Sequence, residues 1–228
     1  MARLSRYGGW RRIVHLTLCV AALAAAPARA AGPLIWALGD SLTAGYGLPP
    51  ADGFTVQLEA ALRRAGVPAT VRNGGISGDT SAQGRARLKW GLRGLGTAPD
   101  LVILELGAND MLRGLPPAQA EAHLDAILAE LQRRHIRVLI AGMKAAPNLG
   151  PDYRRAFDAI YPRLAQRYGA ALYPFFLDGV AGQRVLIQAD GLHPNARGVA
   201  IIVGRMVPAV KAALAKAQPR ALAAARGG

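Results

Sequence analysis

The sequence is poor in cysteine, in acidic residues and in aromatic residues, and each shortage excludes something. A single cysteine, Cys19, excludes a disulfide scaffold and a cysteine-rich zinc site. Only 14 acidic residues oppose 28 basic ones, so the 228-residue chain has a net charge of +14, which first suggests nucleic acid or an anionic surface as a partner. Aromatic residues make up only 6% of the chain and form no stacking platform among the basic clusters. A solvated basic surface is therefore the favoured interpretation, with transient contact to anionic lipid and no nucleic-acid partner.

Hydrophobic runs are short, and a notable one lies near the start of the chain. Four arginines within the first twelve residues precede an apolar run over residues 13–26, which is too short to span a membrane comfortably. Small residues at an A-x-A site follow at 28–30, and this order is typical of a secretory signal peptide. We expect residues 1–30 to be cleaved after Ala30 and the protein to be periplasmic or secreted. A retained N-terminal anchor is the alternative.

The rest of the chain has the composition of one globular domain. Hydrophobic residues make up 52% and charged residues 18%, which excludes a disordered or collagen-like chain. The length suits a single domain, which we expect over residues 31–218. Residues 219–228 are rich in alanine, arginine and glycine, and we expect them to form a disordered tail.

Short apolar runs alternate with helical periodicity along this domain. Strands are expected at residues 34–38, 70–72, 101–106, 137–143 and 171–175. Helices are expected from Phe54 to near Gly66, from Thr80, from Pro116, over 153–168 and over 199–214. This alternation predicts an α/β protein, a three-layer α/β/α sandwich with a mostly parallel five-stranded sheet and right-handed crossovers.

Ligands bind beyond the carboxyl ends of the strands in such sheets, and three polar groups directly follow predicted strands. A fourth group lies near the C-terminus. The four groups are Gly39-Asp40-Ser41-Leu42, residues 73–80, Gly107-Ala108-Asn109-Asp110 and residues 190–195.

Each group has a chemical interpretation and a plain structural one. Ser41 on a strand-to-helix turn is placed as a nucleophile or, alternatively, as a helix cap. The glycines around Gly78 free backbone N–H groups for an oxyanion, or simply form a flexible loop. The side-chain amide of Asn109 can donate to a negative charge that develops during the reaction, or it can form a hydrogen bond to the backbone of its own turn. Asp190 lies three residues before His193, which lets the carboxylate meet Nδ1 and leaves Nε2 as a base, or both belong to a surface loop.

Together, and in this order, the four groups resemble the SGNH (GDSL) hydrolase family. Longer phrases at residues 40–47, 76–81, 160–162 and 174–176 are similar to its periplasmic thioesterase I/lysophospholipase branch and to the related arylesterases. The resemblance extends from about residue 34 to about residue 214 and implies the flavodoxin-like sheet of that family. One departure is Ala108, where the thioesterase branch often has a second glycine.

The resemblance also implies roles for these residues. Ser41 would attack an ester or thioester carbonyl, His193 would take its proton, and Asp190 would orient His193. The oxyanion would be bound by the backbone N–H groups of Ser41 and Gly78 and by the side chain of Asn109. Asp40 is expected to hold the turn. The family chemistry needs no cofactor, and the sequence offers no cluster of metal ligands.

Apolar loops suggest the class of substrate. Met111 and Leu112 follow the central strand, and Met143 and Pro147 follow the next strand, so an acyl chain or aryl group is favoured over a sugar. We expect a small acyl ester or a lysophospholipid as substrate and a monomeric protein. A carbohydrate acetyl esterase on the same fold and a non-catalytic binding protein remain as alternatives.

Overall fold

The computed structural model describes residues 32–216. The predicted signal peptide over 1–30 and the predicted tail over 219–228 lie outside the described residues. Both therefore stay predictions, and the architecture below concerns only the domain between them.

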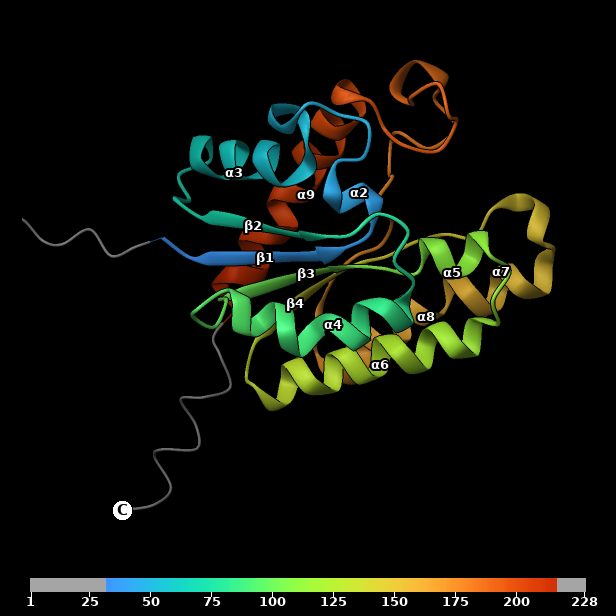
Figure 1. The fold of residues 1–228 in the computed structure, drawn as a ribbon, viewed down its shortest axis with the longest axis horizontal. Coiled ribbons are helices and arrows are strands. Elements are labelled where there is room, and N and C mark those ends of the chain that lie inside the picture. The colour runs from blue at the N-terminus through green and yellow to red at the C-terminus, as the bar shows by residue number, and fades with distance from the viewer. Residues whose placement is uncertain (1–31, 217–228) are drawn as a thin grey trace, which may run out of the picture. The chain divides into compact units, whose positions relative to one another are not determined.

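The domain is built on a five-stranded sheet in which every pairing is parallel (Figure 1). The strands are β1 (Leu34–Gly39), β2 (Thr70–Gly75), β3 (Leu101–Glu105), β4 (Arg137–Ala141) and β5 (Ala171–Tyr173). Their order in the sheet is β2-β1-β3-β4-β5, so the direction of winding reverses between β1 and β3. In open α/β sheets this reversal opens a crevice beyond the strand ends, where ligands bind.

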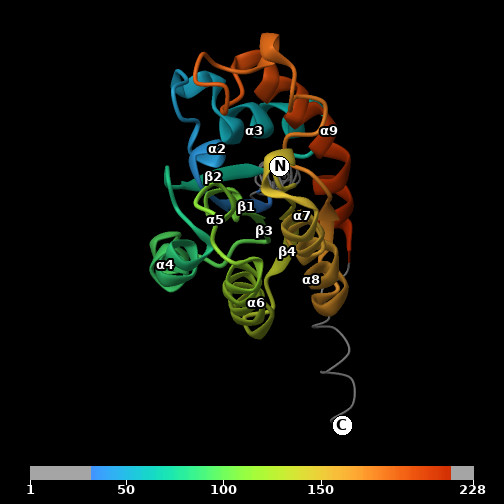
Figure 2. The ribbon, with the colours of Figure 1, turned by 90° about the vertical axis from the view of Figure 1, so that its right-hand side faces the viewer.

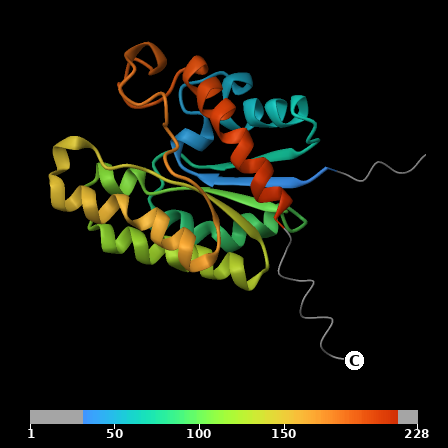
Figure 3. The same ribbon diagram turned by 180° about the vertical axis from the view of Figure 1, so that it is seen from behind.

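Helices cover both faces of the sheet, which confirms the predicted three-layer sandwich. On one face α3 (Phe54–Arg64) packs beside α9 (Ala196–Ala215), and α9 runs obliquely across the strands (Figure 3). The other face carries α4 (Ser81–Gly94), α6 (Pro117–Arg133) and α8 (Ile160–Tyr168) (Figure 2). Because it is covered on both sides, β3 is buried at all five of its residues, as its sequence, apolar apart from Glu105, predicts.

Short elements gather near the carboxyl edge of the sheet. They are the helices α2 (Ser41–Ala44), α5 (Ala108–Leu112) and α7 (Pro151–Asp158) and the 3₁₀ turns η1 (Pro50–Asp52), η2 (Pro147–Leu149) and η3 (Arg184–Leu186). Of the residues predicted to form the site, Ser41 lies on α2 and Asn109 on α5.

Local signals at the helix ends are mostly confirmed. α4 begins directly after Thr80, as predicted, and Thr80 and Gln83 form a capping box there, each side chain accepting the other residue's backbone N–H. The single helix predicted over 153–168 is wrong: it is two helices, α7 and α8, that meet at Ala159. Pro162 has no N–H to donate to the carbonyl of Asp158, so the helical ladder is interrupted at this point.

Candidate active site

Ser41 is the first residue of α2, directly beyond the end of β1. Asp40 is the N-cap of this helix, and its Oδ1 accepts the backbone N–H of Leu42 at 3.0 Å. Asp40 therefore holds the turn, as the sequence predicted. The turn places the Ser41 side chain at the sheet reversal between β1 and β3.

Ser41 lies in a continuous line of hydrogen bonds with His193 and Asp190. Its Oγ is 2.8 Å from Nε2 of His193, and Nδ1 of His193 is 2.6 Å from Oδ2 of Asp190. A carboxylate only accepts, so Nδ1 carries the ring proton and Nε2 is free to accept the serine hydroxyl. The structure thus brings together three residues that the sequence singled out in two separate groups.

Asp190 is held in its ionised form. Its Oδ1 accepts the N–H groups of Leu192 at 2.9 Å and His193 at 3.1 Å. The Leu192 N–H, then the His193 ring and the His193 N–H, lower the pKa of Asp190 from 3.8 to about 2. At neutral pH a full negative charge therefore faces the histidine ring.

Two residues to which the sequence analysis gave no role fix the loop that carries His193. Gln188 donates its backbone N–H to the carbonyl of His193 at 2.7 Å, and its Nε2 donates to the carbonyls of Tyr46 at 2.8 Å and Pro194 at 3.0 Å. The ring of Tyr46 lies tilted against the imidazole, with ring centres 4.6 Å apart. Gln188 thus ties the histidine loop to the loop after α2. Sequence reasoning missed both roles: Tyr46 lies in the phrase 40–47 that resembles the family but was given no function there, and Gln188 lies in none of the matching phrases.

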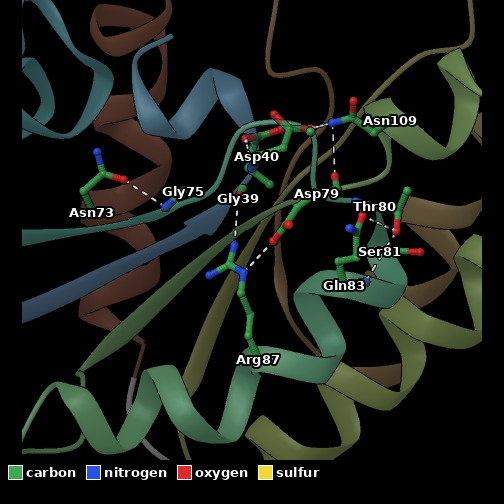
Figure 4. A network of polar contacts seen from close by, with 12 residues as sticks. Gly39, Asp40, Asn73, Gly75, Asp79, Thr80, Ser81, Gln83, Arg87 and Asn109 are labelled. Atoms are coloured by element: carbon green, nitrogen blue, oxygen red, sulfur yellow. Dashed lines mark hydrogen bonds and ion pairs between the residues drawn. The ribbon is translucent and has the colours of Figure 1, made fainter.

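Donors for a negative charge surround Ser41. Within residues 32–216, the backbone N–H groups of Ser41 and Gly78 donate to no protein acceptor. Gly78 has a φ of 85°, which glycine adopts without strain. Asn109 lies beside them, but its Nδ2 already donates to Oδ2 of Asp40 at 3.0 Å and to the carbonyl of Asp79 at 3.1 Å (Figure 4). All three predicted donors therefore line the same cavity. The N–H groups of Ser41 and Gly78 have no protein acceptor among the described residues, whereas the amide of Asn109 already donates two hydrogen bonds.

A second carboxyl group is buried beneath the Ser41 turn. Oε2 of Glu105 accepts the hydroxyl of Thr43 at 2.7 Å and the backbone N–H of Asp40 at 3.3 Å, and its Oε1 has no partner among the described residues. Burial, and then the charge of Asp40, raise the pKa of Glu105 well above its usual value. Burial also raises the pKa of Asp40 to about 6, although the hydrogen bonds from the N–H of Leu42 and the amide of Asn109 lower it. At neutral pH Asp40 is therefore mostly ionised, and burial favours the neutral form of Glu105.

An apolar cavity of about 430 Å³ opens onto Ser41 and His193. The four residues predicted to bind substrate all line it: Met111, Leu112, Met143 and Pro147. Further lining residues that the sequence did not single out are Tyr46, Lys144, Phe175, Leu177, Ala181 and Leu192. The ammonium of Lys144 stands 5.4 Å from the centre of the Phe175 ring and is the cation of this lining. The cavity is suited to an apolar group of a substrate.

Other hollows of the domain lack this chemistry. A hollow of about 550 Å³ between α4 and α6 is larger, but it has no serine, and its residues include Arg85, Lys89 and His123. Among residues 32–216 no group of three or more histidine, cysteine, aspartate or glutamate side chains is placed to hold a metal ion. The cavity at Ser41 is therefore the candidate active site.

Comparison with known sequences points to the same chemistry. The family model described as "GDSL-like Lipase/Acylhydrolase family" matches residues 37–201. The chain is 40% identical over 183 residues to the esterase TesA of Pseudomonas aeruginosa, covering 80% of this chain and 90% of that one. It is 41% identical over 158 residues to an arylesterase of Vibrio mimicus, covering 69% and 78% of the two chains. To the thioesterase 1/protease 1/lysophospholipase L1 of Escherichia coli it is 39% identical over 166 residues, covering 73% and 77%.

Solved structures agree with these matches. The crystal structure of AlinE4, described as an SGNH-hydrolase family esterase, is 51% identical to this chain with a TM-score of 0.69. The match covers 81% of this chain and 98% of AlinE4. Since both the family model and the relatives span most of the described domain, the chain belongs to the GDSL-like lipase/acylhydrolase family and is an ester hydrolase of the SGNH type.

Proposed function

We propose that this protein is a serine esterase in which Ser41 is the nucleophile, His193 the general base and acid, and Asp190 the residue that orients His193. The observation that supports this is the unbroken line of hydrogen bonds from Oγ of Ser41 to the carboxylate of Asp190 at the mouth of an apolar cavity. A cap alone would explain the position of Ser41 but not its bond to a histidine 152 residues away.

The reaction proceeds through an acyl-enzyme. Oγ of Ser41 attacks the ester carbonyl while Nε2 of His193 takes the hydroxyl proton. The tetrahedral oxyanion accepts bonds from the N–H groups of Ser41 and Gly78 and from Nδ2 of Asn109. The intermediate collapses, Nε2 gives its proton to the leaving alcohol or thiol, and the acyl group stays on Ser41. Water then attacks the acyl-enzyme with His193 again as base, and the carboxylic acid leaves.

Small acyl esters and lysophospholipids are the proposed substrates. The cavity of about 430 Å³ is lined mainly by aliphatic and aromatic side chains, which accommodate an acyl or aryl group. Lys144 is exposed at this lining, and its ammonium, which lies over the Phe175 ring, is placed to meet an anionic headgroup. The relatives named arylesterase and thioesterase 1/protease 1/lysophospholipase L1 support the same range of esters.

We also propose transient contact with anionic lipid surfaces. Tyr46, Leu112 and Leu192 line the cavity and are each about half exposed, so they form an apolar rim at its mouth. The whole chain has a net charge of +14, and about +9 remains once residues 1–30, with five arginines and no acidic residue, are removed. An apolar rim on such a basic protein fits a membrane surface that has an apolar interior and a negative exterior. The Ser41→Ala protein should sediment with phosphatidylglycerol vesicles at low salt and much less with phosphatidylcholine vesicles. Equal binding to both would contradict the role of charge.

The central experiment compares the purified protein with Ser41→Ala and His193→Ala. The panel is p-nitrophenyl esters of increasing acyl length, phenyl acetate, a lysophospholipid, an acyl-CoA and an acetylated glycan. We expect both variants to lose about 10⁴–10⁶-fold in kcat on every ester that the parent hydrolyses. His123→Ala, on α6 and outside the cavity, is the matched control and should keep full activity.

A covalent label gives an independent readout. A phosphonate that reacts with nucleophilic serines should add one adduct to the parent protein and none to Ser41→Ala, as seen by intact mass. Undiminished hydrolysis by Ser41→Ala would refute the proposal. Release of acetate from the glycan alone would instead favour the acetyl esterase, and no labelling of the folded parent would favour a binding protein.

Export is a further proposal, which rests on the pattern of residues 1–30. Protein recovered from the periplasm of an expressing bacterium should begin at Ala31. An uncut chain that stays with the membrane fraction would indicate the retained anchor.

A further inference from the structure

The amide of Asn109 is fully committed in the structure. An amide nitrogen carries two hydrogens, and here one bonds Oδ2 of Asp40 at 3.0 Å and the other bonds the carbonyl of Asp79 at 3.1 Å. An oxyanion can reach this nitrogen only if one of the two acceptors gives way. The identity of the acceptor that stays then determines where the amide points.

The two acceptors differ in strength and in attachment. The acceptor on Asp40 is an ionised carboxylate, and bonds to ionised acceptors are about twice as strong as neutral ones. The acceptor on Asp79 is a neutral backbone carbonyl. We therefore expect the bond to the Asp79 carbonyl to yield to the oxyanion, while the bond to Asp40 remains and acts as the pivot of the amide.

Asp40 is itself held so firmly that it can serve as this pivot. It is fully buried, and its Oδ1 accepts the N–H of Leu42 at 3.0 Å while Oδ2 accepts from Asn109. Its backbone N–H donates to Glu105, and the preceding carbonyl, that of Gly39, accepts from Arg87 at 2.8 Å (Figure 4). One carboxylate thus connects the turn of the proposed nucleophile with a donor from another loop, 69 residues along the chain.

We propose that Asp40 is a positioning residue of the oxyanion hole, whose carboxylate fixes the amide of Asn109 relative to the N–H groups at Ser41. This inference rests on the proposed function of Ser41 and Asn109, and it goes beyond the role of Asp40 as a helix cap. Asp40 acts through Asn109 and does not touch the substrate. Its contribution should therefore depend on the presence of the amide.

Substitutions at Asp40 separate the two roles. The carboxamide of Asp40→Asn has one acceptor oxygen, so it can serve the N–H of Leu42 or the amide of Asn109, but not both. Serine is a good N-cap and can serve Leu42, but it is too short to reach Asn109. Asp40→Ser therefore keeps the cap and loses only the pivot, which protects the test against simple loss of folding.

The test is a double-mutant cycle on p-nitrophenyl butyrate with Asp40→Asn, Asp40→Ser, Asn109→Ala and the combined variants. Asn109→Ala should lower kcat by about 10²–10³-fold. Each substitution at Asp40 should lower kcat by about 10-fold or more, with KM changed less than about twofold, because the amide contributes mainly in the transition state. In the Asn109→Ala background the same substitutions should cost less than about threefold. Asp52→Asn, on η1 outside the cavity, is the matched control and should leave kcat unchanged.

Two outcomes would overturn the proposal. One is an equal loss of kcat from the Asp40 substitutions with and without Asn109, which would assign Asp40 a role in the fold alone. The other is parent-like kcat in Asp40→Ser. Ser41→Ala, assayed alongside, separates the role of Asp40 from the proposed function of Ser41. If Ser41→Ala is inactive while the cycle is additive, only the role of Asp40 is refuted. If Ser41→Ala is active, the proposed function is refuted as well.

Discussion

Removal of the Asp110 carboxylate should destabilise the protein by about 4 kcal/mol, although Asp110 takes no part in the proposed reaction. Its Oδ2 accepts the backbone N–H of Ser81 at 2.7 Å, and its Oδ1 accepts the hydroxyl of Ser81 at 2.6 Å. Asp110 is 1% exposed and Ser81 is fully buried, so water cannot replace either bond. The pair joins the start of α4 to α5.

The magnitude follows from the two bonds. A hydrogen bond to a charged group contributes about 1.5–3 kcal/mol, and Asp110→Ala removes both while leaving the N–H and the hydroxyl of Ser81 buried and unpaired. Since losses in one network are not additive, about 4 kcal/mol is expected. Asp110→Asn should cost only about 1–2 kcal/mol, because its oxygen can accept the N–H and its NH₂ can donate to the Ser81 hydroxyl.

Urea denaturation at pH 7, followed by circular dichroism, measures both values on one scale. The comparison of the two variants is decisive, because both remove the charge and only alanine removes the bonds. If Asp110→Ala and Asp110→Asn lost the same free energy of unfolding, the charge of Asp110 would stabilise the fold and its two hydrogen bonds would add nothing. A loss below about 1 kcal/mol for Asp110→Ala would show that the two bonds stabilise the fold far less than hydrogen bonds to charged groups usually do.

Three further variants test other parts of the structure. Gly107→Ala should lower the melting temperature, because φ is 115° there and a Cβ would lie 2.3 Å from the Tyr161 hydroxyl, whereas Gly94→Ala, with open space around its Cβ, should not. Glu105→Gln should flatten the pH dependence of stability, because the raised pKa of Glu105 makes its contribution full below the ordinary value of about 4.5 and lost as the pH rises through the higher value of the folded state. A parent-like fall in the stability of this variant above pH 4.5 would contradict this. Gln188→Ala should lower kcat about 10-fold in initial-rate assays, since two backbone carbonyls, one in each loop, lose their donor; an unchanged kcat would show that the loops hold without it.

The sequence predicted the sheet well because its strands are marked by local composition. The run over residues 101–106 is apolar apart from Glu105 and is bounded by Pro99-Asp100 and Gly107, and the strand is found there. The convergence of Ser41, Gly78 and Asn109 could also be anticipated, since parallel strands end at one edge, whereas His193 follows no strand directly and its meeting with Ser41 was expected only from the family resemblance. Local signals sufficed wherever a strand end or a helix cap fixed the residue.

Contacts between distant residues could not be predicted in this way. Nothing in the local sequence of Asn109 indicates that its amide meets Asp40, because the two residues are 69 positions apart and the contact depends on how two loops pack. Gln188 was missed for the same reason: its side chain bonds a carbonyl 142 residues away. The interruption near Ala159 was missed because periodicity continues through it, while the hydrogen bond that Pro162 cannot make leaves no trace in the hydrophobic pattern.

The distance along the chain between Ser41 and His193 has a consequence for biosynthesis. The serine follows the first strand, and the histidine precedes the last helix, α9, which packs on α3 beside the start of the sheet. If Ser41 and His193 act as proposed, a growing chain contains its nucleophile long before it contains its base. Partly synthesised chains that end before His193 should then be inert toward esters, so the onset of hydrolysis would report that the chain has passed this point and folded.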